Sequence, residues 1–136
     1  MMRLFFLGAL LALAQCSKAP LSKVEPLKGA IESENKVFSV TPTWLTGPVA
    51  RNYSSVRLSL SAAEGVVATT DEITIDPQMP AHGHGTSTDD QVITIESSQS
   101  VRVEGIYFVM GGAWVIHLSA KVNGKTDTAL IPVEVP

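Results

Sequence analysis

The chain has 136 residues, of which 45% are hydrophobic and 17% charged, and its formal net charge is -3. This length and apolar content fit one globular domain with an attached segment. The ten basic residues are scattered along the chain, which excludes the concentrated positive surface of a nucleic-acid-binding protein.

The N-terminus has the layout of a secretory signal. Arg3 precedes an apolar run, Leu4–Ala14, and a polar stretch follows Cys16. Roughly eleven apolar residues are too few to cross a bilayer, which takes about twenty. We therefore predict a signal peptide over residues 1–15 and an exported protein.

Cys16, the one cysteine of the chain, is the predicted point of membrane attachment. The segment Leu13-Ala14-Gln15-Cys16 resembles the bacterial lipobox, in which cleavage occurs before a cysteine that then receives lipid, although Gln15 departs from the small residue usual there. Ser17, in place of Asp, resembles the pattern forwarded to the outer membrane, which implies an outer-membrane lipoprotein facing the periplasm. The alternative is ordinary cleavage after Ala14, which leaves Cys16 as an exposed thiol. With one cysteine, no disulfide within the chain and no cysteine-rich metal site can form.

After the cysteine, residues 16–36 have the composition of a flexible tether, with Pro, Gly, Lys and Glu and almost no aromatic or β-branched side chains. From Val37 to Pro136, short β-rich runs alternate with turn residues, which predicts an all-β domain, an antiparallel sandwich or barrel. The expected strands are Val37–Thr41, Ser55–Ser61, Val66–Thr69, Glu72–Asp76, Gln91–Glu96, Val101–Met110, Ala113–Val122 and Lys125–Val135.

Two dipeptides predict tight hairpins near the C-terminus. Gly111-Gly112 and Asn123-Gly124 both tolerate the positive φ of primed turns, so the last three strands should form a meander. In that register Tyr107 faces Ile116. The better core face then holds Val103, Tyr107, Val109, Trp114, Ile116 and Leu118, and the opposite face holds Ile106, Phe108, Met110, Val115 and His117.

The segment Met79-Pro80-Ala81-His82-Gly83-His84-Gly85 contains two of the three histidines of the chain. Residues two apart on an extended segment point to one side, so His82 and His84 could reach one ion, with Met79 beside them. Imidazole and thioether together are ligands that copper prefers. Alternatively, Gly83 and Gly85 supply the backbone angles of a turn, and the histidines only cap exposed backbone groups.

Other residues with possible ligand or catalytic groups decide how far this predicted site could extend. In the expected hairpin Met110 and His117 lie roughly 13 Å apart, so they cannot share an ion. Met110 lies beside a loop and is the outer candidate ligand. His117 is predicted to be a half-buried strand residue instead. Asp89 and Asp90 could add oxygen ligands or simply form a solvated loop. Ser87, His82 and Asp89 lack the strand-to-helix turn of a nucleophile, so we do not expect an enzyme.

The order of these features resembles the YtkA-like domain family, which is related to FixH-like proteins. The residues that carry the resemblance are Trp44, Gly47-Pro48, Asn52, Met79-Pro80, His82, His84-Gly85, Gly105, Tyr107, Met110-Gly111 and Trp114. It covers most of residues 37–136 and implies an immunoglobulin-like β-sandwich of about seven or eight strands. Some members occur with copper-handling or oxidase-assembly proteins. In this chain Ala81-His82 stands where a Gly-Met pair is common, which replaces a thioether with an imidazole and favours tolerance of Cu(II) as well as Cu(I).

Two functions therefore follow as hypotheses. The first is a periplasmic copper-binding accessory protein with Met79, His82 and His84 as ligands and Met110 as an outer ligand. The second is a metal-free binding or assembly module of an envelope complex, which would dock through the face around Ile106, Phe108 and Val115.

Overall fold

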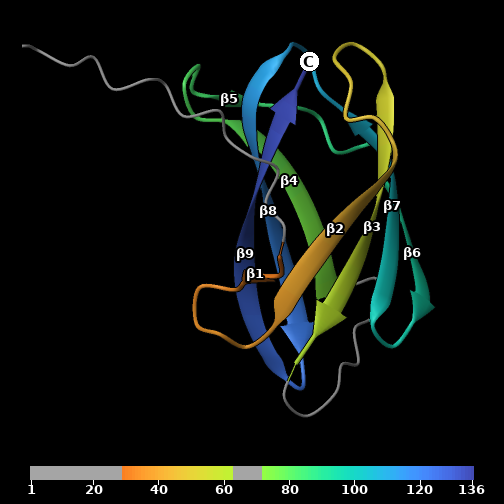
Figure 1. Cartoon of the computed structure of the whole chain (residues 1–136), viewed down its shortest axis with the longest axis vertical. Coiled ribbons are helices and arrows are strands. Elements are labelled where there is room, and N and C mark those ends of the chain that lie inside the picture. The colour runs from red at the N-terminus through yellow and green to blue at the C-terminus, as the bar shows by residue number, and fades with distance from the viewer. Residues whose placement is uncertain (1–28, 63–71) are drawn as a thin grey trace, which may run out of the picture.

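The computed structural model describes residues 29–62 and 72–136. In this part of the chain, nine strands form two antiparallel sheets that pack face to face (Figure 1). One sheet has the order β1 (Ile31–Glu32), β2 (Ser39–Thr46), β3 (Tyr53–Ser61), β7 (Ser100–Tyr107) and β6 (Val92–Ser97). The other has the order β5 (His84–Gly85), β4 (Ile73–Met79), β8 (Gly112–Val122) and β9 (Lys125–Val135).

This order confirms the expected all-β sandwich and is immunoglobulin-like. The neighbours β2-β3-β7-β6 correspond to strands A-B-E-D of an immunoglobulin domain, and β4-β8-β9 correspond to strands C-F-G. These seven strands are the long ones, and β1 and β5 add two residues each. The predicted strand at Val66–Thr69, the signal peptide and Cys16 lie outside the described residues.

The sandwich begins earlier than Val37. Ile31 already pairs with Val40 in β2, and the following loop is held by Asp127 of β9. Asn35 donates from its backbone N and from Nδ2 to the Asp127 carboxylate, at 2.9 and 2.8 Å. Burial works against the charge on Asp127, but hydrogen bonds from Ser33, Asn35 and Thr128 outweigh it and hold its pKa below the usual range. The end of the predicted tether is therefore part of the fold.

Of the two predicted tight turns, one forms and the other does not. Asn123 and Gly124 have φ of 50° and 80° and join β8 to β9, as expected for a primed turn. Gly111-Gly112 instead connects two sheets, because β7 pairs with β3 and β6 while β8 pairs with β4 and β9. The predicted pairing of Tyr107 with Ile116 is therefore wrong. The apolar runs on either side of the glycines face each other across the core.

A bulge at Gly105 changes which side chains of β7 point inward. Val56 pairs with Val103 and Ser54 with Ile106, so β7 carries one residue more than β3 over this stretch, and Gly105 has φ of 76°. After the bulge Ile106 and Phe108 are both 0% exposed, whereas Val109 is 39% exposed. The predicted docking face around Ile106, Phe108 and Val115 is therefore wrong, because two of its three members are core residues.

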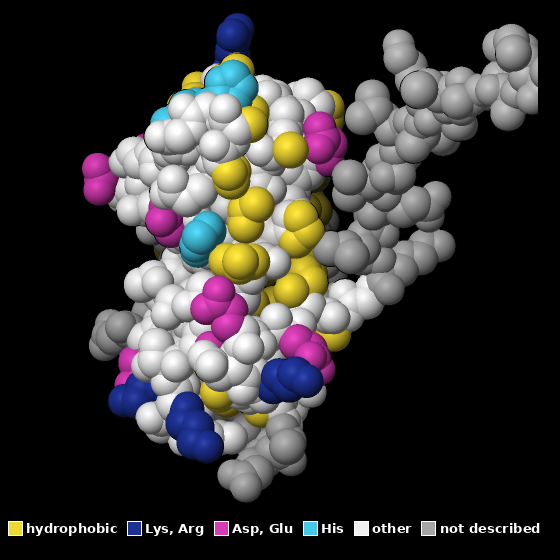
Figure 2. Space-filling model, turned by 90° about the vertical axis from the view of Figure 1, so that its left-hand side faces the viewer, with side chains coloured by type: hydrophobic (Ala, Val, Ile, Leu, Met, Phe, Trp, Pro, Cys, Tyr) yellow, Lys and Arg dark blue, Asp and Glu magenta, His cyan; other side chains and the backbone are white. Residues whose placement is uncertain are grey.

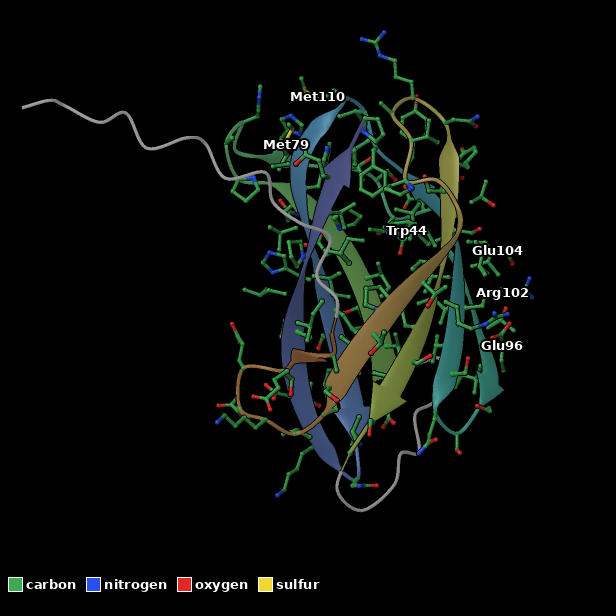
Figure 3. All side chains as sticks on the ribbon, viewed as in Figure 1. Trp44, Met79, Glu96, Arg102, Glu104 and Met110 are labelled. Carbon is green, nitrogen blue, oxygen red and sulfur yellow. The ribbon has the colours of Figure 1, made fainter. Side chains whose placement is uncertain are left out.

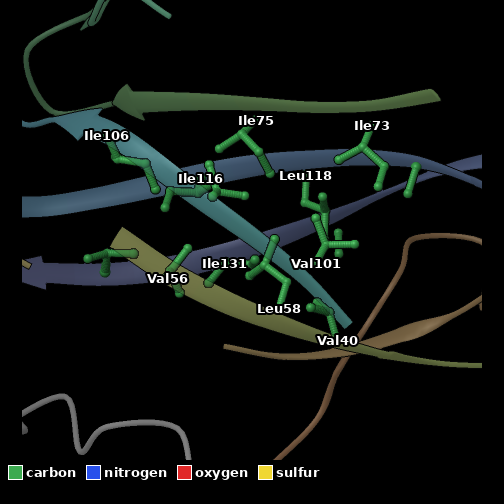
Figure 4. Close-up of a cluster of buried hydrophobic side chains, with 14 of the residues drawn as sticks. Val40, Val56, Leu58, Ile73, Ile75, Val101, Ile106, Ile116, Leu118 and Ile131 are labelled. Carbon is green, nitrogen blue, oxygen red and sulfur yellow. The ribbon is translucent and has the colours of Figure 1, made fainter. Parts of the chain in front are cut away.

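The core lies between the sheets. Its buried aliphatic side chains come from every long strand except β6, whose Ile93 and Ile95 are half-buried against it, and Phe108 and Trp114 are its largest fully buried members. Figure 4 shows Val40, Val56, Leu58 and Val101 of one sheet packed against Ile73, Ile75, Ile116, Leu118 and Ile131 of the other. Full burial of each such side chain contributes roughly 1.5–3 kcal/mol. Because the chain has one cysteine, no disulfide within the chain can form, and this packing supplies the stability of the domain.

The outer strands carry features that interrupt pairing with a further strand. β1 and β5 are too short to cover the full length of β2 and β4, and those two strands contain Pro42 and Pro77. β9 ends its sheet and contains Pro132. Proline has no N–H, so within a sheet it suits positions that face an unpaired edge.

The edge strand β6 contains a register shift between Ile95 and Ser97. At this bulge Glu96 accepts two hydrogen bonds from Arg57, at 2.6 and 3.0 Å. The hydrogen bond from Arg57 is the main reason that the pKa of Glu96 falls to about 2. Figure 3 shows Glu96 together with Arg102 and Glu104 at this edge of the sandwich.

A candidate metal site at one end of the sandwich

One end of the sandwich brings together the segments that carry the candidate ligands. β4 and β7 both run toward this end, where β5, the connection between β7 and β8, and the C-terminus meet (Figure 1). The loop clustering typical of immunoglobulin-like sandwiches therefore places residues 79–85 beside residues 108–112.

A tight turn after β4 sets the positions of the two histidines. The N–H groups of His82 and Gly83 both donate to the carbonyl of Met79, at 3.1 and 3.0 Å. Gly83 has φ of 66°, which favours glycine, and the chain then reverses to form β5. In β5, His84 pairs directly with Met79. A thioether and an imidazole therefore occupy opposed positions of a two-strand ladder.

The two imidazole rings lie close enough to share an ion. Their centroids are 5.8 Å apart, with an interplanar angle of 63°. If one nitrogen of each ring bound the same ion at about 2 Å, the centroids would lie about 4.5 to 6.3 Å apart. The observed separation falls within this range.

The ring of His84 has a backbone hydrogen-bond partner on one side. Nδ1 lies 3.2 Å from the carbonyl oxygen of Gly85. In the tautomer that donates from Nδ1 to this carbonyl, Nε2 is the nitrogen with the free lone pair. Many metal-binding histidines are oriented in this way by a backbone carbonyl. His82 is exposed, and the described residues provide no hydrogen-bond partner for its ring.

The two methionines that are candidate ligands, Met79 and Met110, lie at the same end (Figure 3). Met79 is 4% exposed, and its methyl group would lie 2.7 Å from a Cβ placed on Gly112, so the end of its side chain rests against that glycine. Met110, two residues before Gly112, is half-buried and packs against the core. Gly112 thus allows the loop that carries Met110 to lie over the Met79 side chain.

An aromatic contact joins the site to the core. The ring of His84 packs edge-on against Trp114, with centroids 5.7 Å apart, and Trp114 packs against Phe108 at 5.3 Å. The indole Nε1 of Trp114 donates to the carbonyl of Met110 at 3.0 Å. From the sequence, Trp114 was expected to serve the core or an interface. The regular spacing of Met110-Gly111-x-x-Trp114 is the signal that could have indicated its contact with the site.

The remaining polar candidates lie elsewhere. His117 is on the outer face of β8, opposite Asp76 and Leu130, away from the turn and short strand that carry His82 and His84. Asp90 accepts a hydrogen bond from Tyr53 at 2.7 Å, which raises the pKa of that phenol. Within residues 29–62 and 72–136, no three His, Cys, Asp or Glu side chains converge as metal ligands. A metal at this end would therefore depend on thioethers as well as imidazoles.

Comparisons with protein families, with curated proteins and with solved structures gave no match. Among the described residues, no helix has the length and apolar character needed to cross a bilayer.

Proposed function

We propose that this chain is an exported, lipid-anchored protein of the YtkA-like kind that binds a copper ion at the loop end of its sandwich. The ligands are His82, His84 and Met79, with Met110 completing the set. The single observation that supports this most is the pair of imidazoles 5.8 Å apart, one of which pairs with Met79 in the β4–β5 ladder.

The chemistry of these donors favours copper over other ions. Thioether sulfur is a soft ligand that selects Cu(I), and imidazole suits both oxidation states of copper. Hard ions such as Mg²⁺ and Ca²⁺ prefer oxygen ligands, carboxylates above all, and no three acidic side chains converge in the part of the chain that the structure describes. A site built on short turns near the surface suits an ion that is delivered and passed on rather than one held permanently.

Copper titration of the full chain in mild detergent tests this proposal. The affinities for Cu(I) and Cu(II) are measured by competition with chromophoric chelators, for the wild type and for the double variant His82→Ala/His84→Ala. His117→Ala is the matched control, because it removes a histidine of the sheet face. We expect the double variant to lose at least about tenfold in affinity for both ions and the control to lose none. Equal binding by all three chains contradicts the proposal.

The alternative function, a metal-free binding module, needs a different surface from the one that the sequence suggested. Figure 2 shows apolar side chains along the outer face of the four-stranded sheet, where Val115 of β8 lies opposite Pro132 of β9 and Leu130 is 41% exposed. Under this alternative, Leu130→Asp abolishes recovery of an envelope partner, whereas His82→Ala/His84→Ala leaves it intact. The reverse result favours the copper site.

A further inference from the structure

Trp114 contacts two candidate ligands that come from separate segments of the chain. Its indole ring packs edge-on against the imidazole of His84 in β5, with centroids 5.7 Å apart. Its Nε1 donates to the carbonyl of Met110, in the connection between β7 and β8, at 3.0 Å. With 1% of its surface exposed, the indole is fixed by the core, so it is a rigid reference point for both.

The segment that carries Met110 needs such a fixed point. Gly111, which follows Met110 directly, gives this connection more accessible backbone conformations than another residue would, up to Gly112, where pairing with Val135 begins β8. The carbonyl of Phe108 accepts from the N–H of Arg51 at 2.7 Å, which holds the start of the connection. The bond from Trp114 holds the carbonyl of Met110 itself, beside the Met110 side chain.

We propose that Trp114 is a positioning residue that sets the distance between the thioether of Met110 and the imidazole of His84, and thereby gives the site its affinity for Cu(I). This inference rests on the proposed copper site. Trp114 acts through its N–H bond to Met110 and its edge contact with His84, and it is not itself a ligand. Because Cu(I) depends on thioether ligands more than Cu(II) does, a displaced Met110 weakens Cu(I) binding selectively.

Trp114→Phe is the informative substitution. It keeps an aromatic ring in the core and against His84 but removes the N–H that bonds to Met110. Trp44→Phe is the matched control, since Trp44 also packs edge-on against Phe108, at 6.1 Å, on β2 of the opposite sheet. Thermal unfolding of both variants, followed by circular dichroism, establishes that each is folded at the temperature of the assay.

The experiment measures Cu(I) and Cu(II) affinities of the full chain by chelator competition for the wild type and both variants. We expect Trp114→Phe to bind Cu(I) about 10-fold or more weakly, in the range typical for loss of a group that orients a ligand, and to bind Cu(II) within about threefold of the wild type. Trp44→Phe should match the wild type for both ions. In metal-free protein, the methyl NMR resonance of Met110 should move toward its position in an unfolded chain in Trp114→Phe only.

The outcomes separate this inference from the proposed function. A Trp114→Phe chain with wild-type affinity for Cu(I), an equal loss for both oxidation states, or an unchanged Met110 methyl resonance overturns the positioning role. A wild-type chain that binds neither ion overturns the copper site.

Discussion

Gly105→Ala tests the bulge that decides which side chains of β7 enter the core. A Cβ at Gly105 would lie 2.0 Å from the carbonyl oxygen of Asp90 and 3.2 Å from the Cα of Gln91. Both neighbours are backbone, so the segment at Asp90 must move by at least about 1 Å before ordinary contact distances return. Gly124→Ala is the matched control, because its φ of 80° is close to the 76° of Gly105 and no described atom lies within 4 Å of the added Cβ.

Both substitutions place alanine in a left-handed backbone conformation, but only Gly105→Ala also creates a steric clash. A left-handed backbone costs alanine about 1–2 kcal/mol, and the stiffer unfolded chain offsets about 0.4–1 kcal/mol of that. Gly105→Ala adds the cost of overpacking, typically about 1–3 kcal/mol. It also strains the segment that Tyr53 holds through its hydrogen bond to Asp90. We expect Gly105→Ala to destabilise the domain by about 2 kcal/mol more than Gly124→Ala, averaged over these ranges.

Urea unfolding, followed by tryptophan fluorescence, measures this difference. At about 4–8 °C per kcal/mol for a domain of this size, the same difference should lower the melting temperature by about 8–16 °C relative to Gly124→Ala. Equal destabilisation by the two substitutions would show that the 90–91 segment yields freely and would refute the steric reasoning.

Three further predictions concern the site, the edge strand and the N-terminus. Gly112→Ala places a Cβ 2.7 Å from the methyl group of Met79 and strains a φ of 124°, so it should displace that side chain and weaken Cu(I) binding about tenfold in chelator competition; unchanged binding would contradict this prediction. The folded pKa of Glu96 is lowered from 4.5 to about 2, so its stabilising effect is present above pH 4.5 and is lost as the pH falls to 2. The melting temperature of Glu96→Gln should therefore fall less over that interval than that of the wild type, and parallel curves would contradict the ion-pair explanation. Cys16→Ser should abolish lipid attachment, seen as the loss of acyl mass in intact-protein mass spectrometry, whereas a wild-type chain without acyl mass would favour cleavage after Ala14.

The sequence was sufficient to predict the strands in which buried and exposed residues alternate regularly. The runs ending at Val122 and Val135 occur as predicted, because each alternates buried and exposed residues and Asn123-Gly124 specifies the turn between them. The bulge at Gly105 was missed, since a glycine inside a strand pattern is compatible with regular pairing until the partner strand is known. This one residue moved Ile106 and Phe108 from the predicted surface to the core.

The candidate site could be predicted in part. The residue types of Met79, His82 and His84 indicated an ion site, but the expectation that both histidines lie on one extended segment was wrong, because His82 and Gly83 belong to a turn and only His84 lies in β5. The pairing of His84 with Met79 and the contact of Trp114 with His84 depend on how the chain turns back and on which strands become neighbours. Such contacts between distant segments leave no periodic signal in the sequence.

The prolines at positions 42, 77 and 132 have a consequence for molecules of this chain at high density. Growth of one shared sheet through many copies requires an unbroken row of amide donors along a border, and each proline removes a donor from that row. These three borders are therefore poor templates for fibril growth, and the remaining border, β6, is interrupted by its register shift instead. Recognition of other molecules is left to side chains at the loop end and on the sheet faces.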